Sequence, residues 1–301
     1  MKLKNFYKRN KDKTIFYFFD DLISRIVNHR ISLLASSQVY YIVLSIFPFL
    51  IALVNILALA DLKTKILIPN LPTALPDDIK KILLNFVSGV EASSSPLLLI
   101  ASSALGLWSA SRGFMSIMQN INTSYKLPHK RQFFISKILS FFMALVCLTL
   151  FTLALFFMVF GGSILNLLEN ILKVDISFDY LILRINSYLI PLIFIGVMVY
   201  IIYYASPNIR DKKTFPKRLF LPGTLFAILG FFITSRAFSY YVESISKFSV
   251  TYGSLGGIVV FLVWLYLMNF IILTGGEINA HFYCKFIGSD NESSIFEDLI
   301  K

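Results

Sequence analysis

Three ionisable side chains stand inside long apolar stretches of the sequence, where charged residues are otherwise rare. They are Arg112 in GLWSASRGF, Arg236 in TSRAFSY and Glu277 in TGGEINA. A charge at the centre of a bilayer costs about 3 kcal/mol or more, so such residues often mark a substrate path, although long side chains also extend to the nearer interface. Both interpretations stay open for the two arginines. If the stretches that carry Arg112 and Glu277 pack together, we expect these charges to pair.

Polar neighbours of these charges complete a candidate substrate path. Trp108 and Ser109 precede Arg112, and Asn269 lies about two helical turns before Glu277. The stretch around Trp108 also repeats small residues every four positions, which favours close packing of another helix, with a polar path as the alternative. These small residues are Ser102, Gly106 and Ala110.

Glycine and proline near the ends of apolar stretches offer places where a helix can kink or hinge. The hinge candidates are Pro48, Gly253, Gly256, Gly257, Gly275 and Gly276. The pattern Ser-Arg-x-Phe occurs at both Arg112 and Arg236, as an inverted repeat would require, but the other stretches show no comparable match.

Signatures of catalysis are missing from the sequence. The histidines His29, His129 and His281 lie far apart, without HExxH or any other metal-ligand spacing, and each is expected at a membrane interface. Cys147 and Cys284 form no CxxC motif, and no phosphate loop or GxSxG elbow is found. We therefore expect no enzyme activity, no catalytic residue, no metal and no cofactor.

Composition places the chain in the membrane class. Of its 301 residues 56% are hydrophobic and only 15% are charged, against about 25% charged in soluble domains, and the mean hydropathy is +0.72. A helix needs about 20 apolar residues to cross a bilayer. The fold class predicted is an all-α polytopic membrane protein with about six transmembrane helices and short amphipathic interfacial helices. The six stretches are 33–60, 97–118, 138–160, 188–205, 219–241 and 254–280.

The distribution of positive charge predicts the orientation. Most of the 28 Lys and Arg residues fall in alternate loops, on the side that also carries both termini. Because basic loops stay in the cytoplasm, the N- and C-termini are expected there, in a multi-pass protein of a bacterial inner membrane. The net charge of +11 is thus largely a topology signal, so membrane lipids rather than nucleic acid are the expected partners. Homo-oligomerisation is left open.

Amphipathic segments flank the predicted membrane domain of residues 33–284. Residues 1–32 are expected to form a basic cytoplasmic tail and an interfacial helix, and 285–301 a cytoplasmic tail. From residue 15 to 27 apolar side chains recur at helical spacing, with Asp20, Asp21, Ser24, Arg25 and Asn28 on the opposite face. This helix is predicted to lie on the membrane surface, with packing against the bundle as the alternative. Similar segments lie at 76–90 and 164–172.

Several blocks resemble one family of proteins. They are ASSQVYYIVLSIFPF at 35–49, GLWSASRGFMSIMQNINTSYK at 106–126, the pair Pro222-Gly223, and TYGSLGGIVVFLVWLYLMNFIILTGGEINA at 251–280. Together and in this order they resemble the YihY/BrkB family of bacterial inner-membrane proteins. The resemblance implies six spans and no established catalytic site. Some members were labelled as a transfer-RNA-processing ribonuclease, ribonuclease BN, an attribution regarded as mistaken.

The resemblance also implies a direction for function, because some members have been linked to movement of lipids or lipopolysaccharide precursors. The leading hypothesis is a transporter or translocator of a lipid or another amphiphilic or anionic solute. A non-transporting scaffold for envelope assembly is the alternative, and a membrane-bound ribonuclease is the third and disfavoured one. A polar cavity reached by Arg112 or Arg236 would favour transport, and a solidly packed bundle would favour a scaffold.

Overall fold

The computed structural model describes residues 14–59, 85, 88–125, 127, 132–150, 153, 179–209, 216–244 and 254–287. Every regular element in these ranges is a helix, which confirms the predicted all-α class. The helices are α2 (Thr14–Asn28), α3 (Ile31–Leu59), α5 (Pro96–Ser124), α7 (Asp179–Ala205), η2 (Lys217–Phe220), α8 (Leu221–Ser244) and α10 (Ser254–Ile287). A further helix, Phe133–Leu150, carries no label.

Within the described residues, five helices are long and apolar enough to cross a membrane. They are Ile31–Ala52, Pro96–Ser124, Phe133–Leu150, Lys217–Phe238 and Ile258–Phe286, and each overlaps a predicted span. The remaining predicted span, 188–205, falls in α7, where Leu192–Ala205 forms a shorter apolar helix. The predicted amphipathic segment 164–172, most of 76–90 and the C-terminal tail beyond residue 287 lie outside the described residues.

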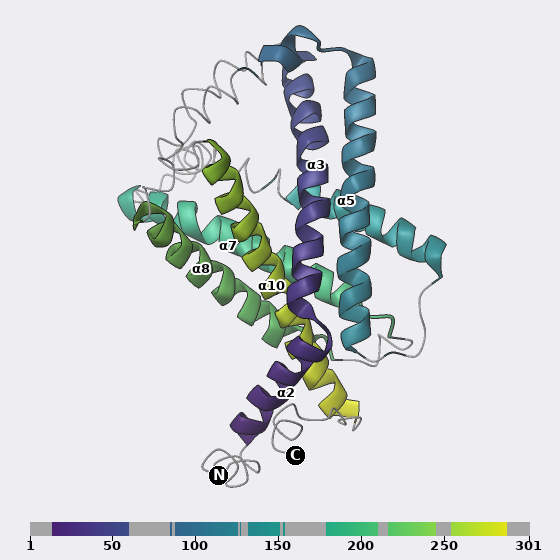
Figure 1. The fold of residues 1–301 in the computed structure, drawn as a ribbon, viewed down its shortest axis with the longest axis vertical. Helices are drawn as coiled ribbons and strands as arrows, with labels where there is room; N and C mark the ends of the chain where they lie inside the picture. Colours follow the sequence, from purple (N-terminus) through teal and green to yellow (C-terminus); the bar gives the residue numbers. More distant parts are fainter. Residues whose placement is uncertain are drawn as a thin grey trace, which may run out of the picture.

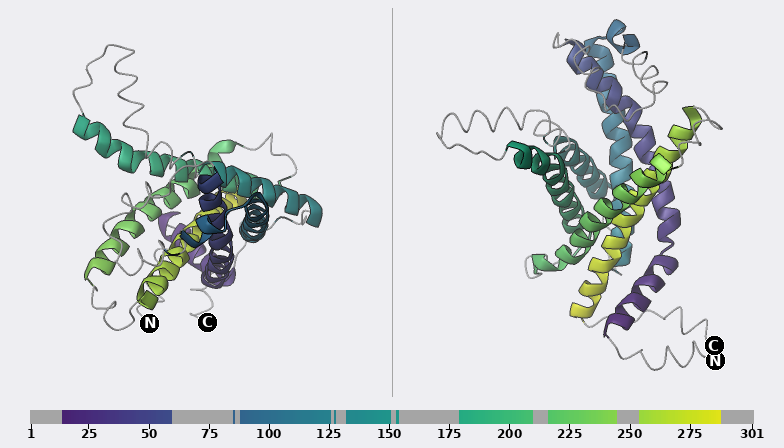
Figure 2. Two further views of the ribbon diagram at one scale, coloured as in Figure 1. Left: turned by 90° about the horizontal axis from the view of Figure 1, so that it is seen from above. Right: turned by 90° about the vertical axis from the view of Figure 1, so that its left-hand side faces the viewer.

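The helices are arranged around α10. In Figure 1, α3 and α5 stand upright side by side and run in opposite directions, and α10 crosses behind them. On its other side α10 packs on α8, and α8 packs on α7 (Figure 2). Residues 271–281 of α10 are all buried, so this part of the helix is enclosed on every side.

The pairing of α3 with α5 uses the small residues seen in the sequence. Ser95 caps α5, accepting a hydrogen bond from the backbone N–H of Leu98 at 3.2 Å, and Pro96 occupies the first turn. A Cβ added to Gly106 would touch Pro48 and Phe49 of α3 at 3.4–3.5 Å, an ordinary contact distance. Here the packing interpretation accounts for the small residues. Pro48 itself lies inside α3, which continues through it.

A second close crossing joins α8 to α10. A Cβ on Gly223 would overlap the carbonyl oxygen of Gly275, and a Cβ on Gly275 would overlap the hydroxyl of Tyr203. The backbone N–H of Gly223 donates to Asn279 Oδ1 at 2.7 Å, and the Tyr203 hydroxyl donates to the Ile272 carbonyl at 2.6 Å. Glycine is needed at both positions, because any side chain there would collide with the neighbouring helix.

The hinge candidates in α10 thus have a packing role in this structure. Gly275 lies against α8, and Gly276 faces Ile121 of α5, whose Cγ1 would lie 3.1 Å from an added Cβ. Both are buried within a helix that runs without interruption from Ser254 to Ile287. Gly256 and Gly257 lie in the first turn of α10, and Gly253 lies outside the described residues.

We predict that Gly223→Ala destabilises the protein by about 1–3 kcal/mol, because its Cβ would force α8 away from Gly275 and Asn279. Thermal unfolding of the detergent-solubilised protein measures this change. The matched control is Gly89→Ala, since nothing lies within 4 Å of a Cβ at that helical position. Equal unfolding temperatures for the two variants would contradict the close crossing.

Candidate functional site

The first helix turns its polar face inward, opposite to the prediction from its sequence. Asp21 is 7% exposed and Arg25 is 0% exposed, and Asp20 and Ser24 are buried beside them. The large apolar side chains of Phe19, Ile23 and Val27 are instead exposed. The buried charges show that α2 packs against the bundle, which is the alternative interpretation of this segment. The reason is that α10 offers polar partners for the charged face.

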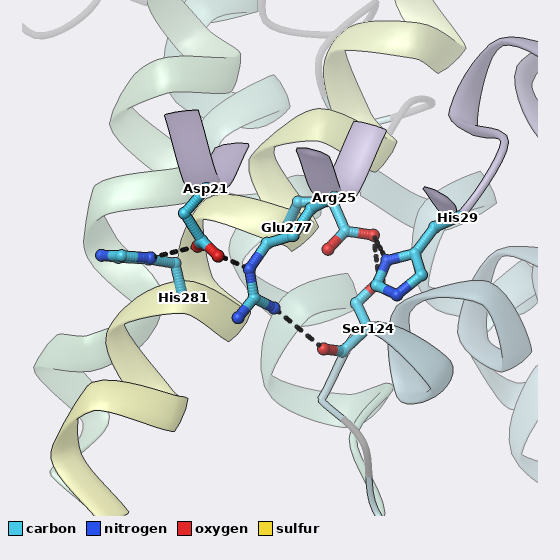
Figure 3. A network of polar contacts seen from close by, with 6 residues as sticks. All are labelled: Asp21, Arg25, His29, Ser124, Glu277 and His281. Carbon is cyan, nitrogen blue, oxygen red and sulfur yellow. Dashed lines mark hydrogen bonds and ion pairs between the residues drawn. The ribbon is translucent and has the colours of Figure 1, made fainter. Parts of the chain in front are cut away.

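One part of this polar network centres on Asp21. Arg25 Nε donates to Asp21 Oδ2 at 2.7 Å, and His281 Nδ1 of α10 lies 2.5 Å from the same oxygen (Figure 3). Arg25 Nη1 also approaches the carbonyl oxygen of Ser124, at the end of α5, at 3.4 Å. A buried arginine without partners would be prohibitively unfavourable, and here Asp21 of its own helix and Ser124 of α5 supply them.

The other part of the network centres on Glu277, which is 0% exposed. Its Oε1 lies 2.7 Å from His29 Nδ1 and 2.6 Å from Ser124 Oγ (Figure 3). The serine hydroxyl donates to this oxygen, and the imidazole nitrogen lies within hydrogen-bond distance of it. Glu277 therefore ties the turn after α2 and the end of α5 to the central helix.

The spacing of these residues explains how the helices match. On the α2 side they follow every four positions, at Asp21, Arg25 and His29, and on α10 they do so at Glu277 and His281. Residues four apart lie on one face of a helix, so each helix presents one polar stripe to the other. Asp21 meets His281 and His29 meets Glu277, which makes the two stripes antiparallel.

The turn after α2 holds this arrangement in place. Arg30 has a φ of 52°, in the left-handed region that non-glycine residues rarely adopt. The N–H of His29 donates to the Arg25 carbonyl at 2.9 Å, and the N–H of Arg30 donates to that of Val27 at 3.0 Å, which closes the end of α2. The chain then enters α3 at Ile31 with α2 directed along the end of α10 (Figure 2).

The network also sets the charge state of Asp21, which lies outside the membrane-spanning segments. Burial raises the pKa of this carboxyl, but the hydrogen bond from His281 and the charge of Arg25 act in the opposite direction and together prevail. The pKa consequently lies below its ordinary value of 3.8. Asp21 is ionised at neutral pH and can balance the charge of Arg25.

Arg112 takes no part in the network, so the expected pairing of Arg112 with Glu277 is wrong. The α5 residue that reaches Glu277 is Ser124, which is 12 positions further along the helix and about 18 Å away at 1.5 Å per residue. The error came from the length of α5, which continues to Ser124 rather than ending near residue 118. Arg112 consequently lies near the middle of its helix.

Arg112 instead belongs to a cationic cluster around Trp108. Its guanidinium carbon lies 5.2 Å from the centre of the Trp108 ring, and Lys137 Nζ lies 5.8 Å from the same ring. Lys137, in the helix Phe133–Leu150, also donates to Ser111 Oγ at 2.8 Å. Among the side chains that the structure describes, no carboxylate forms an ion pair with Arg112 or Lys137. Two positive charges therefore converge within the spans on one half-exposed aromatic ring.

The other predicted path residues are separate from this cluster. Arg236 is exposed on α8, with its guanidinium carbon 5.8 Å from the centre of the Phe232 ring. Asn269 is buried in α10, and its Nδ2 donates to the Leu265 carbonyl of the same helix at 2.7 Å. Ser109 is buried on the packing face of α5. The structure thus brings together Trp108 and Arg112 of the predicted path.

A polar cavity of about 450 Å³ lies beside the C-terminal half of α5. Its walls come from α5, from the helix Phe133–Leu150 and from the segment after α7. Neither Arg112 nor Arg236 lines it, although Met115, one turn beyond Arg112, does. Its lining residues are Met115, Met118, Gln119, Asn120, Asn122, Thr123, Phe133, Ser136, Ser206 and Asn208.

Two of the three histidines are members of the network. His281 is 2% exposed and contacts Asp21, and His29 is partly buried and contacts Glu277. His129 lies outside the described residues. Within the described ranges no three His, Cys, Asp or Glu side chains form a group that could hold a metal ion.

Sequence reasoning missed Asp21, Arg25 and His281 as members of a site, and it also missed Lys137. For the network a signal existed, since charged residues repeat every four positions both near residue 21 and near residue 277. Two such stripes in one membrane protein indicate that two helices meet. Lys137 gave no comparable signal, because a lysine in the first turns of a span is normally read as an interfacial residue.

These features define an all-α polytopic membrane protein with a buried ionic network and a cationic cluster on two of its candidate spans. Residues 22–291 match the family described as Virulence factor BrkB, which covers most of the chain. The protein belongs to this family, and the resemblance found in the sequence is confirmed.

Relatives are also similar over most of their length. A protein of Bacillus subtilis (strain 168), described as ribonuclease-like protein YfkH, is 30% identical over 87% of this chain and 94% of its own length. A UPF0761 membrane protein of Vibrio atlanticus (strain LGP32) is 29% identical over 86% of this chain and 80% of its own length. No solved structure matches the chain.

We predict that Asp21→Ala destabilises the docking of α2 by about 3–5 kcal/mol, because Arg25 would remain buried without its carboxylate partner. Hydrogen exchange of α2 amides measures the effect. Asn28→Ala, at an exposed position of the same helix, is the control and should change exchange little. Unchanged protection in the Asp21 variant would show that the buried pair does not hold α2.

The pH dependence of the same contact has a definite sign. Because the pKa of Asp21 is depressed in the folded protein, its contribution is complete above about pH 3.8 and disappears as the pH falls through the lower folded pKa. We therefore expect the stability difference between wild type and Asp21→Asn to stay constant from pH 7 to pH 5 and to shrink below pH 3.8. A difference that already shrinks near pH 6 would exclude an ionised Asp21 as the cause. Unfolding at a series of pH values gives the answer.

Proposed function

We propose that this protein translocates an anionic amphiphile, such as an anionic lipid, across a bacterial inner membrane, with both termini in the cytoplasm. The observation that supports the proposal most directly is the cluster of Arg112 and Lys137 on Trp108, within two helices long enough to span. Two cations that no described carboxylate neutralises are unfavourable in hydrocarbon unless an anion visits them.

The surroundings of the cluster suit a headgroup rather than a free ion. Trp108 is 50% exposed and offers an apolar ring beside the charges, as the junction between a headgroup and its acyl chains requires. Ser111, which accepts from Lys137, orients the ammonium group. Arg112 is exposed on the same side of α5 and can form charge-assisted hydrogen bonds to phosphate oxygens.

A scaffold without transport is the second candidate, and the enclosed part of α10 favours it. Residues 271–281 are buried throughout, and Gly223, Gly275 and Gly276 pack too tightly to leave a path along this helix. Translocation would therefore follow the outer side of α5 rather than the centre of the bundle. We infer no enzymatic role. The ribonuclease-like description belongs to the Bacillus subtilis relative, and we do not extend it to this protein.

Purified protein in liposomes with a fluorescent anionic lipid tests the proposal. We expect wild type to equilibrate the lipid between leaflets, and Arg112→Ala combined with Lys137→Ala to slow this about tenfold or more, because charge-assisted contacts are lost. The control is Arg218→Ala, an exposed arginine of η2 outside the cluster, which should leave the rate unchanged. Absence of flux in wild type would favour the scaffold, and equal flux in wild type and the double variant would contradict a role for the cluster.

A further inference from the structure

The cavity beside α5 has a lining of a particular chemical kind. Four amide side chains face it, those of Gln119, Asn120, Asn122 and Asn208, together with the hydroxyls of Thr123, Ser136 and Ser206. None of its lining residues is charged. Amides present both donors and acceptors, and hydroxyl groups of a ligand require both. The cavity is therefore suited to a polyhydroxylated group rather than to an ion.

Two details of the lining support a ligand. Gln119 is exposed, so its amide is accessible to a ligand that enters the cavity. Asn122 Oδ1 accepts from the backbone N–H of Asn208 at 2.7 Å, which fixes the segment after α7 as a wall. The site is thus held open by contacts that do not use all of its polar groups.

The cavity adjoins the cationic cluster. Ser136, in the wall, precedes Lys137, and Met115, also in the wall, is three residues beyond Arg112. At 1.5 Å per residue, Gln119 lies about 10 Å along α5 from Arg112. An anionic group at the cluster and a short chain of hydroxyls in the cavity can therefore belong to one molecule.

We propose that the amide-lined cavity binds the hydroxyl-bearing headgroup of an anionic lipid whose phosphate contacts Arg112 and Lys137. This inference rests on the proposed function and names its substrate class, a phosphodiester lipid with neighbouring hydroxyls in the headgroup. The cluster contributes attraction for any anionic lipid. The cavity contributes the selection among them, because a lipid of equal charge without hydroxyls leaves the amides without partners.

Lipid retention on the intact detergent-purified protein, measured by native mass spectrometry, tests this selection without any transport step. The probes are phosphatidylglycerol, whose headgroup carries two neighbouring hydroxyls, and phosphatidylethanol, a phosphodiester of the same charge whose headgroup carries none. We expect wild type to bind phosphatidylglycerol more tightly. Gln119→Leu should weaken binding of phosphatidylglycerol about three- to tenfold, as loss of one hydrogen bond implies, and leave binding of phosphatidylethanol unchanged. Arg112→Ala should weaken the binding of both lipids to the same extent.

The controls separate the cavity from general effects. Gln132→Leu replaces an exposed glutamine that does not line the cavity, and it should bind like wild type. Ser136→Ala removes a hydroxyl from the opposite wall of the cavity. It provides a second test of lipid selection if Gln119→Leu folds poorly. Equal binding of the two lipids by wild type, or equal losses for both lipids in the cavity variants, would overturn the inference.

The source of the headgroup and the proposed function are distinguished by two further results. Glycerophosphoglycerol carries the same phosphodiester and headgroup hydroxyls in soluble form, and binding of it as tight as that of the lipid would overturn the assignment to a lipid. Selective lipid retention without flux in liposomes would uphold the cavity and contradict translocation. Flux of both lipids at equal rates with no selective retention would do the reverse.

Discussion

A charge enclosed by helices has no water to solvate it, so other side chains must reach it, and that requirement organises this structure. Glu277 is fully buried in the central helix, and its carboxylate is reached by His29 from the turn after α2 and by Ser124 from the end of α5. Four positions later His281 meets Asp21, which in turn holds Arg25. Through these contacts one polar stripe of α10 fixes the positions of the C-terminal ends of α2 and α5.

Close backbone packing completes what the ionic contacts begin. Gly223 and Gly275 bring α8 against the opposite side of α10, and Gly276 admits Ile121 of α5. In an apolar solvent helices gain little from burying apolar side chains, so small residues and buried hydrogen bonds carry much of their association. Residues 271–281 of α10 therefore have no face left for a solute. Polar chemistry that remains accessible lies outside this core, on α5 and the helix Phe133–Leu150.

Hydrophobicity was sufficient to predict the helical class and to locate five of the spans, because runs of about 20 apolar residues have few alternatives. It did not predict the direction of the α2 faces. In water the apolar side of an amphipathic helix turns inward, whereas beside lipid the charged side does so when a partner helix offers a matching stripe. The sequence marked Arg112 as unusual but paired it with the wrong residue. The depth of Arg112 in its helix was judged from a predicted end at residue 118, six residues short of Ser124. Such partners depend on helix contacts, which one sequence does not display.

The network also has a consequence for the order in which the chain is assembled. Asp21 contacts a residue 260 positions later, and His29 one 248 positions later. A ribosome therefore releases the first helix long before its partners exist, and Arg25 stays in contact with water or with the insertion machinery meanwhile. The helix α2 is synthesised first but can dock only after α10 has been made. Docking of α2 is therefore possible only when synthesis has reached the end of α10. A protein cut short before Glu277 would carry an unburied charged stripe at its N-terminus, recognisable by quality control.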